Sequence, residues 1–441
     1  MKRKKPILTI SQIIMLSFFT VIMIGSFVLV LPISGNQPTK YIDALFTVTS
    51  AVCVTGLVVV DTGTHFTTFG HAAILLMIQI GGLGVMTFSA LGVVLMGGQL
   101  SYRFRLILKE ALNRLNLRDV KSIVVKIILA TLMFEGIGFL ILAARWSFDM
   151  SVGKACWYAL FHSVSAFCNA GFALFSDNLM SYRSDIFVNG AISLLIIFGG
   201  IGFTVILELK DFRITKKLSF HSKAALLMTA TLLSVGTVLI FVFENTHSPE
   251  YFSKLPLFEK ILVSFFQSVS ARTAGFNSIN IGAMTQASLL ALIFLMFIGA
   301  SPGGTGGGIK TTTFVCLMGS LIAVIRGHSE VVILKRRLSG DLLLKTFTIT
   351  IVSLILVCSI TILIMGISNR SLIDVLFEVM SAFGTVGLST GITPTLSVVE
   401  KLLIIITMFA GRIGPMTLAI ALAEESRRKR VKYPEGQLLI G

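Results

Sequence analysis

Four short stretches of the sequence have residue types that could bind a cation through backbone oxygens. They read FTVTSAVCVTG at Phe46–Gly56, FHSVSAFCNAG at Phe161–Gly171, FFQSVSARTAG at Phe265–Gly275 and FEVMSAFGTVG at Phe377–Gly387. In each stretch a Phe stands ten residues before a Gly, and small or hydroxyl-bearing residues fill the middle. Four copies at roughly regular intervals indicate a fourfold internal repeat.

The chemistry of these stretches favours a filter for monovalent cations. Backbone carbonyls can replace part of the hydration shell of an ion, and Gly supplies the unusual backbone angles that successive carbonyls need to line a pore. No carboxylate lies close to the Gly in any copy, which favours K⁺ or Na⁺ over Ca²⁺. One such Gly alone is typical of a simple helix C-cap, but four copies in register favour a filter.

A second candidate site is the Gly-rich stretch GASPGGTGGGIK at Gly299–Lys310, which interrupts an apolar run. So many Gly residues with a Pro cannot remain helical, so we expect a flexible loop that lines a cavity and acts as a gate. The predicted gate residues are Ser301, Pro302, Gly303, Gly304, Thr305, Gly306, Gly307, Gly308 and Lys310. A phosphate-binding loop is disfavoured, because Ile309 separates Gly308 from Lys310 and no strand precedes the stretch.

Arg412 is predicted to complete this gate. It lies in GRIGP, in the middle of the last apolar run, where an Arg costs about 2.5–3.5 kcal/mol. It should therefore face the cavity or a carboxylate, and Glu135 is one candidate. Arg412 is interpreted as an electrostatic barrier below the filter, and a purely structural ion pair is the alternative. The sequences GGLG (81–84) and GGIG (199–202) are either close-packing points or hinges.

Composition identifies the elements that must position these residues. The chain has 441 residues, of which 54% are hydrophobic and 13% charged, and long apolar runs recur throughout, as in polytopic membrane proteins. The net charge of +16 lies in short loops and is better explained by anionic lipid and topology than by nucleic acid. Five Cys without a CxxC pair indicate neither a disulfide framework nor a metal cluster. The basic start MKRKK is interpreted as preceding a retained first span, not as a signal peptide.

The predicted fold is an all-α polytopic membrane protein with four M1–P-loop–M2 repeats. Each repeat has a long span, a half-length segment and a second span. The spans are expected at 11–31, 71–96, 123–144, 189–207, 224–243, 286–320, 346–365 and 398–421, and the half-length segments at 41–51, 154–167, 257–271 and 371–383. Eight full transmembrane helices and four re-entrant pore helices would then surround one pseudo-fourfold pore, because irregular backbone at membrane depth must line protein or water.

The predicted organisation along the chain follows these repeats. The four repeats are expected at residues 1–97, 123–210, 224–325 and 346–422, and the third contains the gating loop 299–310. An amphipathic linker (98–122) and two basic linkers (211–223 and 326–345) connect them, and a tail (423–441) follows the last repeat. Most of the 37 Lys and Arg residues lie in the N-terminal segment, the linkers and the tail. The positive-inside rule therefore places both termini in the cytoplasm of a cell whose plasma membrane the chain crosses several times. The stretch 102–120 is expected to lie on lipid, to dock a partner or to be a solvated connector.

The four SAxxxxG-like motifs, the two-span repeats and the Gly-rich third inner helix resemble the Trk/Ktr/HKT superfamily of potassium transporters over nearly the whole chain, most closely its KtrB-type membrane subunits. The resemblance implies a K⁺-channel-like pore and the ion-translocating subunit of a K⁺ uptake system. It places the filter carbonyls at Val54, Thr55, Gly56, Asn169, Ala170, Gly171, Thr273, Ala274, Gly275, Thr385, Val386 and Gly387. The third motif departs from the others at Arg272, which is expected to point away from the pore axis.

The resemblance also implies partners and alternatives. It implies a homodimer, a cytoplasmic KtrA-like regulatory ring that binds ATP or ADP, and no cofactor in this chain besides K⁺ ions in the pore. The tail 433–441 is expected to pack against a second subunit. Because the four motifs differ, Na⁺ or Na⁺/K⁺ transport, or Na⁺-dependent K⁺ transport, remains an alternative. An enzyme is disfavoured by scattered His residues without HExxH, and a transporter for a larger solute by parallel, not inverted, repeats.

Overall fold

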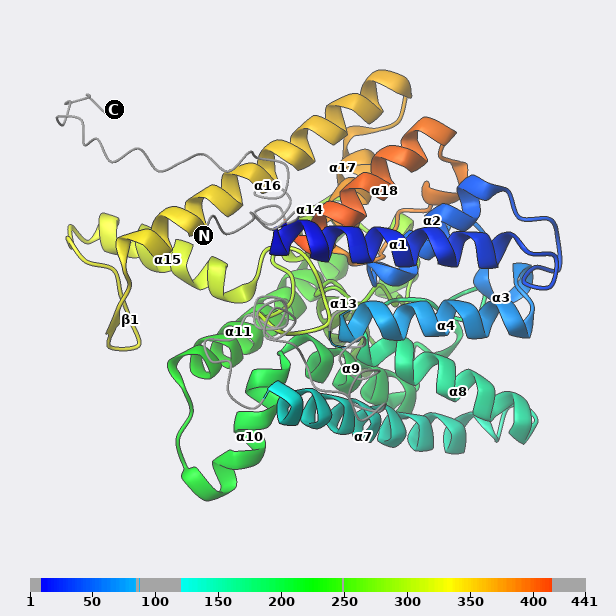
Figure 1. Cartoon of the computed structure of the whole chain (residues 1–441), viewed down its shortest axis with the longest axis horizontal. Helices are drawn as coiled ribbons and strands as arrows, with labels where there is room; N and C mark the ends of the chain where they lie inside the picture. Colours follow the sequence, from blue (N-terminus) through cyan, green and yellow to red (C-terminus); the bar gives the residue numbers. More distant parts are fainter. Residues whose placement is uncertain (1–8, 85–86, 88–119, 248–249, 415–441) are drawn as a thin grey trace, which may run out of the picture.

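The computed structural model describes residues 9–84, 87, 120–247 and 250–414, and these residues are mostly helical (Figure 1). Four long apolar helices stand at the start of the four predicted repeats. They are α1 (Ile10–Val30), α7 (Val120–Trp146), α11 (Phe220–His247) and α16 (Gly340–Ile367). Each contains an apolar stretch of 20 to 28 residues, and a helix needs about 20 such residues to cross a bilayer. A fifth candidate span is a bent pair of helices.

Four shorter helices follow these long ones, and their positions match the predicted half-length segments to within two residues. They are α2 (Tyr41–Val52), α8 (Val152–Phe167), α13 (Leu257–Ser270) and α17 (Leu372–Gly384). With 12 to 16 residues they are too short to cross a bilayer. Each packs against the long helix of its own repeat, and its C-terminal half is buried. We call these four the pore helices.

The alignment of the third motif on Phe265 is wrong by one residue. In each pore helix a fully buried Phe stands four residues before the Ser of the shared Ser-Ala pair, and these Phe residues are Phe46, Phe161, Phe266 and Phe377. Phe265 is only partly buried. Counted from these Phe residues, the third motif has one residue fewer before its Gly. Its pore helix accordingly ends at the Ser of the shared Ser-Ala pair, while the others continue for two or three residues beyond it.

This difference predicts unequal effects of two neighbouring substitutions. Phe266→Ala should lower the free energy of unfolding by about 3–5 kcal/mol, because it leaves a cavity in a closed core. Phe265→Ala, the matched control, should have a clearly smaller effect. Denaturant titration in detergent micelles would measure both, and equal losses would contradict the revised alignment.

A Gly with a left-handed backbone marks the end or the interruption of the second helix in repeats 1, 2 and 4. These residues are Gly84, Gly202 and Gly414, with φ angles of 84°, 94° and 92°, a conformation that only Gly adopts without strain. These Gly residues end α4 (Thr68–Leu83), separate α9 (Ile186–Gly200) from α10 (Phe203–Thr215), and end α18 (Val398–Ile413). The prediction of one continuous span at 189–207 is wrong, because α9 and α10 meet at a bend of 101°.

In repeat 3 the break is a whole loop. α14 (Gln286–Phe297) and α15 (Thr311–Ile325) are separated by the Gly-rich stretch 298–310, as the sequence predicts. The expected helical residues 88–96 and 415–421, most of the stretch 102–120 and the tail 433–441 lie outside the described residues. The structure therefore does not test the predictions made for them.

Close packing against the pore helices accompanies the breaks at Gly84, Gly202 and Gly414. A side chain at Gly81, Gly199 or Gly411 would collide with the carbonyl oxygen of Val52, Phe167 or Phe383, respectively. Each of these carbonyls lies four residues before the filter Gly of the same repeat. The close-packing interpretation of GGLG and GGIG is thus confirmed at Gly81 and Gly199, and GRIG provides a third case. The broken helix of each of these repeats fixes the end of its own pore helix.

Short elements join the helices at the two ends of the molecule (Figure 1). The antiparallel hairpin of β1 (Val332–Ile333) and β2 (Arg336–Arg337) lies with α10 and α15 at one end, which we call the linker end. Helices extend into the two predicted basic linkers, since α10 ends at Thr215 and α16 begins at Gly340. The remaining short helices are α3 (Thr62–His65), η1 (Met180–Tyr182), α12 (Glu250–Ser253), η2 (Ile281–Ala283) and η3 (Thr393–Thr395).

Candidate functional site

The Gly residues that end the four motifs form a closed ring. Gly56, Gly171, Gly275 and Gly387 line one cavity of about 350 Å³. A Cβ atom on each of them would meet a carbonyl oxygen of the next repeat at 2.6 Å or less. The oxygens belong in turn to Ala170, Ala274, Val386 and Thr55, so the contacts run from repeat 1 through repeats 2, 3 and 4 and back to repeat 1. The predicted filter residues of all four motifs are therefore brought together around one axis.

The backbone takes the same unusual course in all four motifs. Two residues before each Gly stands a residue with φ between 49° and 68°, and the Gly itself has φ between 70° and 94°. The first of these residues are Val54, Asn169, Thr273 and Thr385. Left-handed angles are rare for β-branched residues and cost about 1–3 kcal/mol each. Alternation in the sign of φ turns successive peptide groups toward one side of the chain, which suits a lining of carbonyl oxygens.

A Ser near the C-terminal end of each pore helix accepts hydrogen bonds from the filter segment that follows it. The carbonyl oxygens of Ser50, Ser165, Ser270 and Ser381 accept hydrogen bonds of 2.7–2.9 Å from the N–H of Thr55, Ala170, Ala274 and Val386. The hydroxyls of Ser50 and Ser381 also accept from the filter Gly N–H at 3.0 Å. In contrast, the carbonyl oxygens of the twelve filter residues accept no hydrogen bond from another residue that the structure describes.

One further position in the pore helices escaped the sequence analysis. The residue after each buried Phe is polar: Thr47, His162, Gln267 and Glu378. His162 accepts from the N–H of Leu174 at 3.3 Å, Gln267 donates to Ser278 at 3.3 Å, and Glu378 accepts from Ser389 at 3.2 Å and also from Thr393. In repeats 2, 3 and 4 this residue thus ties the pore helix to the chain that leaves the filter. A polar residue next to the Phe in every motif was the signal.

The Gly-rich loop lies against the filter segments of repeats 3 and 4. Gly307 N–H donates to the hydroxyl of Thr385 at 2.9 Å, and a side chain at Gly306 would collide with Thr273. The loop is also fixed to repeat 2, because the N–H groups of Ser301 and Thr305 donate to Gly200 and Gly199 at 2.9 and 3.1 Å. The Lys310 ammonium donates to the Gly306 carbonyl at 2.7 Å. The loop, which belongs to repeat 3, therefore contacts the filter segments of repeats 3 and 4 and the end of α9 in repeat 2.

Arg412 connects this loop to repeat 1. Its guanidinium donates hydrogen bonds to the carbonyl oxygens of Thr305 in the loop and of Gly81 in the break of α4. Of the two expectations for Arg412, a carboxylate partner such as Glu135 is not found, since Arg412 forms no ion pair within the described part of the chain. Glu135 instead accepts from Gln79 at 3.4 Å and lies 4.0 Å from the sulfur of Cys168. The carbonyl of Gly81 also accepts from the N–H of Gly84 at 3.1 Å. These two neutral carbonyls take the place of a carboxylate as partners of Arg412.

Arg272 points away from the ring, as expected from the sequence. It lines a small separate cavity with Ile196, Leu233 and Val269, between α9, α11 and α13. It is not among the residues that line the cavity above the filter. Its guanidinium therefore lies beside α9 and α11 and not at the ring.

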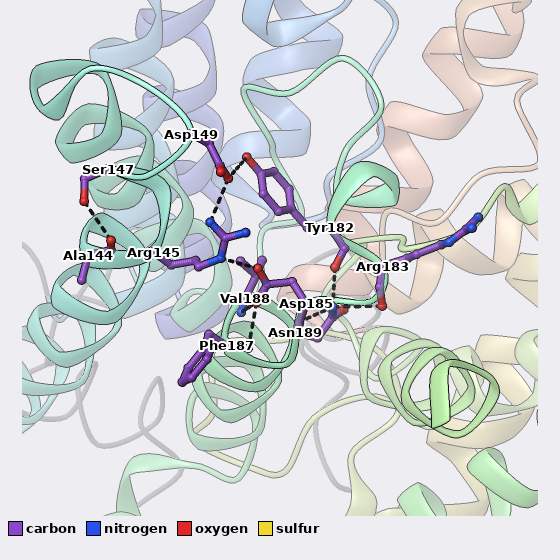
Figure 2. A network of polar contacts seen from close by, with 10 residues as sticks. All are labelled: Ala144, Arg145, Ser147, Asp149, Tyr182, Arg183, Asp185, Phe187, Val188 and Asn189. Carbon is purple, nitrogen blue, oxygen red and sulfur yellow. Dashed lines mark hydrogen bonds and ion pairs between the residues drawn. The ribbon is translucent and has the colours of Figure 1, made fainter. Parts of the chain in front are cut away.

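Carboxylates line the cavity next to the ring, and a polar network holds the chain that follows the second filter segment. Asp61 and Asp177 line the cavity above the ring, where negative charge attracts cations. Figure 2 shows the network in repeat 2, in which Arg145 contacts Asp185 at 2.5 Å and Asp149 at 3.0 Å. Tyr182 donates to Asp149 at 3.2 Å, and burial followed by the nearby Asp149 raises the pKa of Tyr182 to about 12. This network anchors the segment that leads from Gly171 to α9.

Comparisons with known proteins agree with this geometry. A family model, TrkH, described as cation transport protein, matches residues 4–431. The Ktr system potassium uptake protein B of Bacillus subtilis is 41% identical over 98% of this chain and 96% of its own length. The protein of that name from Vibrio alginolyticus is 43% identical over 98% and 94%. The potassium/sodium uptake protein NtpJ of Enterococcus hirae is 36% identical over 100% and 99%.

A solved structure supports the fold as well. The crystal structure of the potassium transporter TrkH from Vibrio parahaemolyticus superimposes with a TM-score of 0.72 at 16% identity, covering 96% of this chain and 87% of the other. With its long apolar helices, the protein is a multi-pass membrane protein. On these matches, and on the ring of four filter segments, the chain belongs to the TrkH family of cation transport proteins.

Proposed function

We propose that this chain is the ion-translocating membrane subunit of a K⁺ uptake system. The observation that carries the proposal is the fourfold ring whose twelve carbonyl oxygens have no hydrogen-bond donor among the described residues. Neutral carbonyls at close quarters replace the hydration shell of a monovalent cation. The pore helices end at this ring, so the negative ends of their dipoles also favour a cation there. Relatives of similar length carry potassium uptake in their names.

The proposed membrane arrangement has eight crossings and four re-entrant pore helices, with both termini in the cytoplasm. Each repeat supplies one long helix, one pore helix and one broken helix around the ring. The linker end, which carries α10, α15 and the hairpin, then faces the cytoplasm, and the cavity lined by Asp61 and Asp177 faces outward. The excess of Lys and Arg in the linkers supports this orientation.

In this proposal the Gly-rich loop and Arg412 close the pathway below the filter. The relatives belong to a "Ktr system" by name, which supports a multicomponent assembly. We propose a homodimer of this chain with a cytoplasmic ring that binds ATP or ADP and moves the loop. The chain itself then needs no cofactor, and K⁺ is its cargo.

Transport of Na⁺ with or instead of K⁺ is the second candidate. The four filter segments have different sequences, and one relative is named a potassium/sodium uptake protein. Purified protein in liposomes, loaded in turn with K⁺, Na⁺ and choline, would separate the candidates. We expect K⁺ flux well above Na⁺ flux and none for choline. Equal K⁺ and Na⁺ fluxes would favour the second candidate, and choline flux would contradict a carbonyl filter.

A further inference from the structure

A second cavity, remote from the ion pathway, lies at the linker end. It has a volume of about 700 Å³ and is lined by residues of α11, α15 and the hairpin, and by the chain between α15 and the hairpin. None of the filter or loop residues lines it. Its floor is apolar and includes Met228, Val315 and Met318, while Arg326, His328 and Ser329 form one edge. The size is in the usual range for a bound small molecule.

The apolar side of this cavity has exposed side chains at its mouth. Leu227 of α11 and Ile322 of α15 line the cavity, and yet 59% and 45% of their surfaces are exposed. Val324 and Ile325, at the end of α15, are 76% and 74% exposed. Both helices are strongly apolar. Such side chains on a membrane-spanning protein face acyl chains instead of water, so an acyl chain can enter between α11 and α15 without leaving an apolar environment.

The other edge of the cavity is cationic. Arg326 follows α15 directly and forms no ion pair with another described residue. The one carboxylate at the edge, Glu330, is already paired with Arg337 at 2.8 Å. Lys335 and Arg336 in the hairpin add further positive charge. An Arg at the end of a membrane helix can extend its head into the layer of lipid headgroups.

We propose that this cavity binds an anionic phospholipid, with an acyl chain between α11 and α15 and the headgroup phosphate on Arg326. Only an amphiphile matches an apolar floor open to lipid beside a cationic edge. The site adjoins the gating loop in sequence, because α15 begins at Thr311, whose hydroxyl is 2.8 Å from that of Ser301 in the loop. A bound lipid would thus stabilise the position of α15, the helix that directly follows the loop. This proposal does not depend on which cation is transported.

Photolabelling of the full chain in phosphatidylcholine vesicles would test the site. The probe is phosphatidylglycerol with a photoactivatable acyl chain, and an otherwise identical diacylglycerol probe lacks the charge. We expect phosphatidylglycerol to label peptides of α11 and α15, and the diacylglycerol to label them more weakly. Arg326→Gln should lower the labelling about fivefold, the effect of one basic residue at a membrane surface. The matched control Arg213→Gln, on α10 at the same end but not at the cavity, should leave it unchanged.

Further variants and a competition experiment distinguish a bound phospholipid from other occupants of the cavity. Ala323→Trp, which fills the cavity, should abolish the labelling, and Leu227→Trp at the more exposed mouth replaces it if Ala323→Trp does not fold. Soluble glycerol phosphate should not compete. Undiminished labelling in the folded Trp variant would overturn the proposal. So would competition by glycerol phosphate, which indicates a site for free phosphate, or cross-links from these peptides to a second copy of the chain without lipid labelling.

Discussion

Gly387→Ala is expected to lower K⁺ uptake and the preference for K⁺ over Na⁺ at least tenfold, about 1.4 kcal/mol of selectivity. Gly387 has φ of 94°, and its missing side chain leaves room for the carbonyl of Thr55 and for Gly56. A methyl group there must displace the carbonyls of the neighbouring repeat. Selectivity depends on the positions of all the carbonyls in the ring, so a shift in one repeat spreads to the next.

Gly391 provides the control for backbone strain. It also has a left-handed φ, 102°, but a Cβ atom there would meet nothing within 4 Å. Gly391→Ala should therefore cost some stability and leave the ion preference unchanged. Uptake of K⁺ and Na⁺ by cells that depend on each variant, corrected for the amount of protein in the membrane, would compare them. Equal ion preference in the two variants would show that the ring of contacts does not set selectivity.

Arg412→Ala is expected to raise K⁺ flux severalfold in liposomes that contain no other subunit. The substitution removes both hydrogen bonds that attach the Gly-rich loop to the break of α4, and it removes the positive charge below the filter. Arg412→Lys keeps the charge but offers no planar fork for two carbonyls, so an intermediate flux is expected. Concentrative tracer uptake into the liposomes would measure all three proteins.

The matched control for a lost buried Arg is Arg272→Ala. Arg272 is buried but faces away from the ring, so its removal should affect stability without raising flux. Flux in Arg412→Ala at the unmodified level would contradict the assignment of Arg412 to the gate. An equal rise in both variants would instead indicate a general loosening of the fold.

The sequence predicted the pore helices closely because their limits are local. Each pore helix is a segment of 12 to 16 residues between two long apolar runs. It has to end where small residues and a Gly begin, and this pattern occurs four times in the sequence. The Gly-rich interruption of repeat 3 was equally local, since no arrangement of neighbours would make it helical. The outward direction of Arg272 followed from the cost of a charge facing cations.

Other features depend on neighbours that the sequence does not name. Glu135 was one candidate partner for Arg412 because charges are visible in a sequence, whereas the carbonyls of Gly81 and Thr305 come within reach of Arg412 only in the folded chain. Phe265 and Phe266 are adjacent and identical in type, so only burial separates them. The bend of 101° between α9 and α10 falls at GGIG (199–202), for which the sequence left close packing and a hinge as alternatives, because hydropathy reports the length of a run and not its direction.

The two hydrogen bonds of Arg412 also predict whether the pathway opens in one step or through intermediates. One planar group on repeat 4 holds a loop of repeat 3 and a helix of repeat 1, so neither bond can lengthen much while the other stays intact. The release should then be a single event with a steep temperature dependence. In electrical recordings we expect two conductance levels without stable intermediates, and the Lys variant should shorten the closed dwell times instead of adding a sublevel.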